Sequence, residues 1–244
     1  MAQSGSSGST AFSLQKRTLT LKPGAADVRV AIFSGSELQS PAPDMLTYLR
    51  QTQADVFIVL GGLGRSNTQA LETARSLASL QRLVLIVRGG ADGFDPSFVA
   101  PPNVLDASTL RSVRIGQDNL LLWPGAEQGR YAVAPSHCGF GEPELQVALD
   151  ELAPPEPGER RWLLTWQAPE PGSQLAGFAV RAGAAGVLYA WPPSDALATT
   201  TWDSAQPQLV PRAWGPRMEA QDGHAIEHGA RVLRFDREGL HEAR

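Results

Sequence analysis

Cysteine is almost missing from this sequence of 244 residues, because Cys138 is the only one. A single cysteine cannot close a disulfide within the chain, and it cannot supply the several thiolates of a cysteine-based zinc site. This usage fits a reducing compartment. Apolar residues make up 42% and charged residues 19% of the chain, which is ordinary for a globular protein with a substantial core.

Lysine is scarce as well, although arginine brings the basic residues to 21 against 25 acidic ones. Lys16 and Lys22 are the only lysines, and the formal net charge is −4. This balance gives no electrostatic attraction to nucleic acid or to an anionic membrane surface. No apolar run approaches the roughly 20 residues that span a bilayer, so we expect neither nucleic acid nor a membrane span.

The N-terminal stretch MAQSGSSGST lacks the basic and apolar regions of a signal peptide. Its serine and glycine content is typical of a flexible segment. The sequence therefore predicts a cytoplasmic protein with a flexible tail over residues 1–12 and one domain over residues 13–244.

The first hundred residues alternate apolar strands with amphipathic helices. FSLQKRTLTL alternates apolar and polar residues and predicts an edge strand. Further strands are expected over 28–33, 54–60 and 83–87, with helices over 43–52 and 68–80. Either Ser66 or Asn67 is suited to cap the second helix. The order β-α-β-α-β is typical of a parallel sheet with right-handed crossovers.

The second half of the chain is less regular. We expect a short strand over 119–125, an amphipathic helix over 142–152, and strands over 161–166 and 185–191. Each of these last two strands is followed by proline, in QAPEPG and PPSD. The segment HGARVLRFDREGL predicts a terminal strand or hairpin.

Five loops, each directly after an apolar strand, follow an order that resembles the calcineurin-like metallophosphoesterases. That family has strands ending in Asp-x-His, Gly-Asp, Gly-Asn-His-Asp/Glu, a histidine followed by prolines, and Gly-His-x-His. The matching stretches are VAIFSGSE, FIVLGGLGRS, LIVRGGAD, LLTWQAPEP and VLYAWPPS. The resemblance implies an α/β sandwich of two mixed β-sheets flanked by helices.

The residues themselves depart from the family pattern. The positions of the family's metal ligands and catalytic histidine hold here Gly35, Glu37, Gly62, Gly90, Ala91, Trp166, Trp191 and Pro193. A shift of one residue in the first loop would place Ser34 and Ser36 there instead. In the third loop, Asp92 is the only residue besides glycine that matches the family pattern.

These departures remove the chemistry that the resemblance would otherwise imply. Family members use two metal ions about 3.5–4 Å apart that share a bridging carboxylate and activate a water. Such ions need oxygen or imidazole nitrogen ligands, and Glu37 alone offers one among the matched positions. We therefore expect no catalytic residue, no metal and no cofactor.

The glycine-rich stretch GGLGRS precedes a helix, which is a setting that favours anions. It lacks the lysine of a P-loop and the third glycine of a dinucleotide fingerprint. Arg65 and Arg88 would add positive charge at the same rim. The alternative is a plain tight turn with two surface arginines.

Two histidine patterns have ordinary explanations. His137 and Cys138 are neighbours, and adjacent side chains of an extended segment point to opposite faces, which argues against a nucleophile pair. His224 and His228 have the spacing of a helical metal site, but glycines flank them. Exposed histidines and a partly buried thiol are the simpler interpretation.

Trp166 and Trp191 stand at two former ligand positions. Their rings would fill the space left by the metals, or they would line an open pocket and stack on a ligand. We favour filling. The remnant pocket would then comprise Glu37, Gly62, Arg65, Arg88, Asp92, Trp166 and Trp191.

The sequence thus predicts a catalytically inactive metallophosphoesterase-like protein that acts as a binding or scaffold module, with another protein as its partner. One alternative is a phosphoesterase with a rebuilt metal site that uses Glu37, Asp92, His137, His224 or His228. The other is a sensor of a nucleotide or a small phosphorylated ligand that binds through GGLGRS and Arg88.

Overall fold

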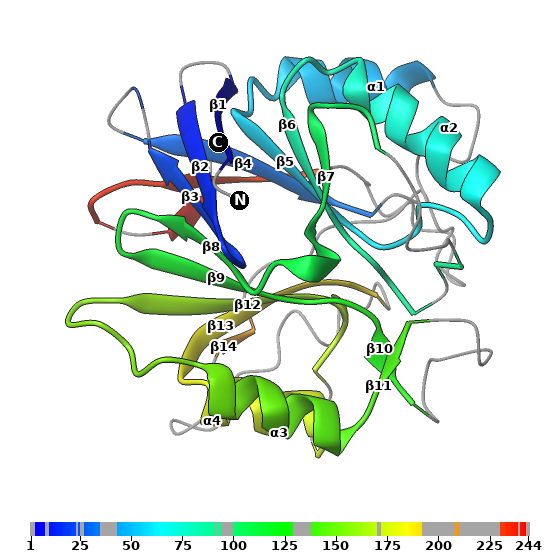
Figure 1. Ribbon diagram of the computed structural model, residues 1–244. Helices are drawn as coiled ribbons and strands as arrows, with labels where there is room; N and C mark the ends of the chain where they lie inside the picture. The colour runs from blue at the N-terminus through cyan, green and yellow to red at the C-terminus, as the bar shows by residue number, and fades with distance from the viewer. Residues whose placement is uncertain are drawn as a thin grey trace, which may run out of the picture.

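A computed structural model describes residues 3–7, 10–22, 24, 27–34, 43–90, 92–93, 100–128, 138–169, 172–191, 208–209, 230–238 and 240–242. These residues form two mixed β-sheets that pack face to face, with helices outside both of them (Figure 1). The α/β sandwich expected from the order of strands and helices is therefore present at this coarse level.

The six-stranded sheet has the order β16-β15-β4-β5-β6-β7. Its strands are β4 (Val28–Phe33), β5 (Val56–Leu60), β6 (Leu83–Val87), β7 (Val104–Asp106), β15 (Arg231–Phe235) and β16 (Leu240–Glu242). The four strands β4 to β7 are parallel, while β15 and β16 form an antiparallel hairpin beside β4. Strands β5 and β6 are buried along their whole length, as uninterrupted apolar runs predict for a sheet covered on both faces.

The eight-stranded sheet has the order β1-β2-β3-β8-β9-β12-β13-β14. Its strands are β1 (Gln3–Ser7), β2 (Thr10–Gln15), β3 (Thr18–Lys22), β8 (Ser112–Ile115), β9 (Asp118–Trp123), β12 (Arg160–Gln167), β13 (Ala184–Trp191) and β14 (Gln208–Leu209). A separate two-stranded parallel ribbon joins β10 (Ala126–Glu127) to β11 (Gly139–Phe140). The 3-10 helix η2 (Ala107–Thr109) links β7 to β8.

Two helices cover the outer face of each sheet (Figure 1). Helices α1 (Pro43–Gln51) and α2 (Asn67–Ala78) pack on the six-stranded sheet, and Ser66 caps α2 as its position predicts. Helices α3 (Glu142–Glu151) and α4 (Gln174–Arg181) pack on the eight-stranded sheet. Sequence patterns did not predict α4. Among the described residues, none of the helices is long and apolar enough to cross a membrane.

The N-terminal segment corrects two expectations. Gln3–Ser7, expected to lie in a flexible tail, forms strand β1 and pairs antiparallel with β2. The Ser7 hydroxyl donates to the carbonyl of Asp55 at 2.7 Å and accepts from the amide of Leu83 at 2.6 Å, so it ties β1 to the six-stranded sheet. The expected single edge strand is the hairpin β2–β3, which turns at Lys16 with a positive φ of 53°.

In each sheet, neighbouring parallel strands end at the same edge, so the loops that follow them gather there. The strands concerned are β5 and β6 in one sheet and β9 and β12 in the other. Three of the five matched loops, those after β5, β6 and β12, lie there, whereas the loops after β4 and β13 are, apart from Ser34, outside the described residues. This edge is therefore the place to test the predicted site.

Candidate functional site

The loops after β5, β6, β9 and β12 meet at one edge of the sandwich. We call the described residues of these loops, together with the last two residues of β12, the loop edge. It comprises residues 61–65, 88–90, 92–93, 124–125 and 166–169. Backbone hydrogen bonds join the first two loops, from the Gly61 amide to the Val87 carbonyl at 2.7 Å and from the Gly93 amide to the Gly64 carbonyl at 3.1 Å. The loops therefore form one connected layer of backbone.

Asp92 holds that layer from inside. Its Oδ1 accepts hydrogen bonds from the amides of Leu63 at 2.8 Å and Gly64 at 3.3 Å, and its Oδ2 accepts from the Gly89 amide at 2.7 Å. The side chain is buried, with the residue 4% exposed. Burial raises the pKa of the carboxyl to about 6. The loss of water around the carboxylate outweighs the three hydrogen bonds from backbone amides and the nearby Arg88 charge, which lower the pKa.

Trp166 closes the space between the two sheets at the loop edge. It lies at the end of β12, is 9% exposed and belongs to the core between the sheets. A Cβ on Gly61 would lie 2.2 Å from the indole Cδ1, and a Cβ on Gly89 would lie 2.8 Å from the indole Cγ. Only glycine lets the indole come so close to both loops. The indole thus fills the space between these two glycines.

A backbone bridge also closes the edge between the two sheets. Gly89, after β6, forms an isolated parallel bridge with Gly125, after β9, and the Gly125 amide donates to the Arg88 carbonyl at 2.7 Å. Gly125 has a φ of 90°, and a Cβ there would lie 2.6 Å from the Cys138 carbonyl oxygen. Cys138 is half-buried, and this burial raises the pKa of its thiol.

The two arginines expected at the rim are placed differently. Arg88 pairs with Asp106, and its Nε lies 3.1 Å from the Asp106 Oδ2. Arg65 is exposed at the surface, and its backbone amide donates to the Gln69 Oε1 at 2.8 Å. The charge of Arg88 is therefore directed toward Asp106.

The amides of GGLGRS are largely engaged within the chain. That of Gly61 binds the Val87 carbonyl, those of Leu63 and Gly64 bind the Asp92 carboxyl, and that of Arg65 binds the Gln69 Oε1. An internal carboxylate thus takes the place that an anionic ligand would need. The tight-turn interpretation of this stretch agrees with these contacts.

The structure brings part of the predicted remnant pocket together. Gly62, Arg65, Arg88, Asp92 and Trp166 all belong to the loop edge, and Arg65 is exposed there. Trp191 ends β13, but its side chain is outside the described residues. Glu37, His137, His224 and His228 are outside them as well.

Three residues of this region were not singled out from the sequence. Asp106 is the ion partner of Arg88, Gly125 bridges the two sheets, and Gln167 accepts the Glu127 amide at 2.7 Å through its Oε1. A usable signal existed for two of them. Asp106 in VLD and Gly125 in LLWPG each come at the end of an apolar run, as the residues of the matched loops do.

Within the described parts of the chain, a group with metal-ligand chemistry lies at the turn between β15 and β16. Asp236, Glu238 and His241 place one ligand atom each within 4.8 Å of one another. His241 already approaches Asp236 at 3.3 Å, and Arg234 approaches the other oxygen of Asp236 at 3.2 Å. The carboxylate is thus engaged by positive or polar groups, and the arrangement is a surface ion cluster.

Comparisons with known proteins leave the family open. The chain matches no protein-family profile and no curated protein sequence. One solved crystal structure is 11% identical, and the match covers 89% of this chain and 98% of the other, with a TM-score of 0.46.

Substitution of Gly61 tests how tightly Trp166 packs on the loop edge. We expect Gly61→Ala to lower the free energy of unfolding by about 1–3 kcal/mol more than Gly116→Ala, because the new methyl group clashes with the indole. Gly116 is a matched control, since its φ of 61° resembles the 65° of Gly61 but no atom lies within 4 Å of its Cβ position. Urea unfolding measures both values. Equal losses would mean that Trp166 does not lie against Gly61.

The raised pKa of Asp92 predicts a pH-dependent stability. The folded pKa of about 6 is above the ordinary 3.8, so the folded state holds the proton more tightly than the unfolded chain. Protonation of Asp92 therefore stabilises the folded state relative to the unfolded chain. This contribution to the free energy of unfolding is complete below the ordinary pKa and is lost as pH rises through about 6. At about 1.4 kcal/mol per pKa unit, it amounts to about 3 kcal/mol.

Comparison with Asp92→Asn isolates this effect from other titrating groups. We expect the stability advantage of the natural protein over the variant to shrink as pH is raised from 4 to 7. Urea unfolding at several pH values measures the difference. A difference that stays constant, or that grows with pH, would contradict the burial of an ionisable Asp92.

Proposed function

We propose that this chain is a catalytically inactive, metallophosphoesterase-like module that binds another protein. The observation that carries the proposal is the chemistry of the loop edge. Asp92 is its only described carboxylate, and both of its oxygens are bound by backbone amides. Among the described residues, the positions where ligands would be expected hold glycine or tryptophan.

A dinuclear metal centre does not fit the described residues of the loop edge. Two ions about 3.5–4 Å apart need a bridging carboxylate and several oxygen or nitrogen ligands. Gly62, Gly90 and Trp166 have no side chain that ligates such ions. The indole of Trp166 also packs directly on the Gly61 and Gly89 backbones, which removes the space between them. We therefore derive no catalytic step through metals.

The architecture supports the metallophosphoesterase-like part of the proposal. Two mixed sheets pack face to face, two helices cover each outer face, and the loops after parallel strands gather at one edge. These features agree with what the five sequence loops imply. The family assignment remains our inference from that combined pattern.

A protein partner suits this edge better than a small substrate. The described loops are closed by direct contacts between their backbones, and by the bridge from Gly89 to Gly125. Small-molecule sites are usually concave and preformed. A closed layer offers a surface for a macromolecule instead.

Neither alternative function gains a specific supporting contact. A sensor of phosphorylated ligands would need the GGLGRS amides and Arg88. Val87, Asp92 and Gln69 already accept from these amides, and Asp106 pairs with Arg88. A rebuilt metal site would use Asp92, whose oxygens are bound by amides. Its other proposed ligands fall outside the described residues.

Metal analysis of the purified protein tests the proposal. After incubation with excess Mn²⁺ or Zn²⁺ and desalting, we expect close to zero bound ions per chain and no hydrolysis of bis-p-nitrophenyl phosphate. Asp92→Asn is the matched variant, and it should give the same result. About two tightly held ions per chain, or metal-dependent hydrolysis that Asp92→Asn removes, would contradict the inactive module.

A further inference from the structure

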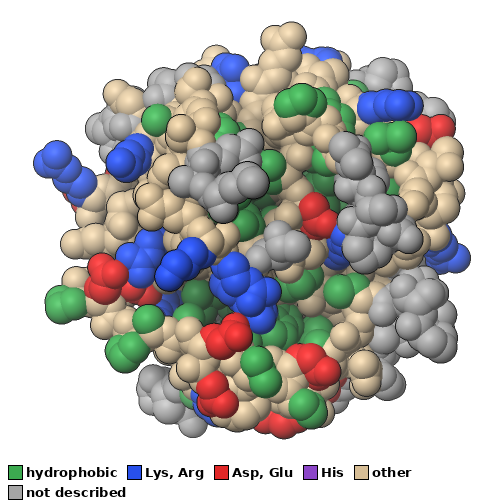
Figure 2. All heavy atoms as spheres, in the orientation of Figure 1, with side chains coloured by type: hydrophobic (Ala, Val, Ile, Leu, Met, Phe, Trp, Pro, Cys, Tyr) green, Lys and Arg blue, Asp and Glu red, His purple; other side chains and the backbone are tan. Residues whose placement is uncertain are grey.

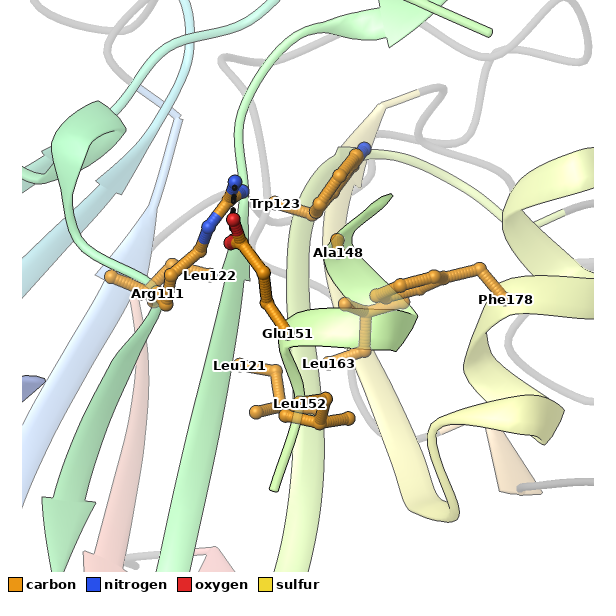
Figure 3. Close-up of a pocket in the computed structure, with 9 residues that line it drawn as sticks. All are labelled: Arg111, Leu121, Leu122, Trp123, Ala148, Glu151, Leu152, Leu163 and Phe178. Atoms are coloured by element: carbon orange, nitrogen blue, oxygen red, sulfur yellow. Dashed lines mark hydrogen bonds and ion pairs between the residues drawn. The ribbon is translucent and has the colours of Figure 1, made fainter. Parts of the chain in front are cut away.

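A separate cavity lies on the outer face of the eight-stranded sheet, between strands β8, β9 and β12 and helices α3 and α4. It encloses about 360 Å³ of empty space, part of it open to solvent. Figure 3 shows its lining side chains converging from the sheet and from both helices.

The walls of the cavity are apolar and tightly held. Leu121 comes from β9 and Leu163 from β12, and both are buried. Phe178 from α4 packs against Trp123 with ring centroids 5.0 Å apart and a tilt of 37°. A ligand with a hydrocarbon body would exchange water for these side chains, which is favourable for each apolar group buried.

Positive charge is in excess at the mouth of the cavity. The Glu151 carboxylate is shared by two guanidinium groups, Arg111 at 3.5 Å and Arg17 at 3.6 Å. Two cations thus face one anion, and the side chain of Glu151 is 51% exposed. Figure 2 shows Lys and Arg side chains gathered over the region of β8 and β9, with acidic side chains beside them over α3. This surplus favours an incoming anion.

Arg111 is placed to receive that anion. The carbon of its guanidinium lies 5.7 Å from the centre of the Trp123 ring, within the range of a cation–π contact. Its contact with Glu151 is long at 3.5 Å, and its Nε–H has no acceptor among the described residues. Burial and the nearby Arg17 charge lower the pKa of Arg111, so a second anion would relieve an unfavourable environment.

We propose that this cavity binds a small monocarboxylate with an apolar body, aromatic or aliphatic. The body would lie against Leu121, Ala148 and Leu152, and the carboxylate would pair with the guanidinium of Arg111 at the mouth. Guanidinium and carboxylate groups match in shape and form charge-assisted hydrogen bonds. The proposal does not depend on the inactive loop edge, because the cavity uses none of the loop-edge residues.

Three probes of equal carbon skeleton separate the parts of this proposal. Isothermal titration of the full chain with 3-phenylpropionate should show saturable binding. The uncharged 3-phenylpropan-1-ol should bind about tenfold more weakly or worse, since it lacks the ion pair, and the cationic 3-phenylpropylamine should bind weakest. Absence of saturable binding of the acid, or equal affinity for the acid and the amine, would overturn the proposal.

Three variants place the binding in this cavity. Arg111→Met keeps the long side chain but removes the charge, and it should weaken binding of 3-phenylpropionate about tenfold or more. Arg114→Met is the control, because Arg114 lies nearby on β8 but pairs with Glu156 and Glu159 instead. Ala148→Leu fills the cavity from α3 without a change in charge and should also weaken binding. Equal effects of Arg111→Met and Arg114→Met, or full affinity in Ala148→Leu, would contradict the assigned site.

Discussion

The carboxyl group of Asp92 accepts backbone hydrogen bonds from two different loops, and the shape of the loop edge depends on these bonds. Leu63 and Gly64 follow β5, and Gly89 follows β6, so a single side chain sets the distance between neighbouring loops. The carboxyl group loses its hydration when it is buried in this way, and the loss of hydration raises its pKa. The three amides would otherwise be buried without acceptors, which is worse for the folded state.

Closure of the sandwich follows from this arrangement. Once the loops are held together, Gly61 and Gly89 leave room for only one large group between them, and the Trp166 indole occupies it. Gly125 then meets Gly89 directly and joins the two sheets. Glycine is thus required at positions 61 and 89 for contact with the indole. Each of these positions is next to one, Gly62 or Gly90, that matches a ligand position of the metallophosphoesterases. These glycines and Trp166 give the loop edge an apolar, closed surface, which is the feature behind the proposed binding role.

Much of the fold could be predicted because strands and helices are marked by local patterns. The apolar runs of β4 and β6 were located to the residue, and Ser66 was one of the two candidate caps for α2. Long-range contacts were not predictable in this way. The serine-rich start of the chain resembles a linker, but Ser7 binds backbone atoms 48 and 76 residues away. Helix α4 was missed because it follows a proline-rich stretch and contains Gly177. At the site, the loops were found, whereas the partner of Arg88 was not, since Asp106 is 18 residues away.

Hydrogen exchange by NMR tests the central role of Asp92 most directly. If its carboxylate holds both loops, the amides of Leu63 and Gly89 should exchange about as slowly as strand amides such as those of Ile58 and Leu85. In Asp92→Asn, exchange at the two loop amides should accelerate much more than exchange in the strands. Loop amides that exchange as fast as the exposed turn at Gly116, or that do not respond to Asp92→Asn, would contradict this account.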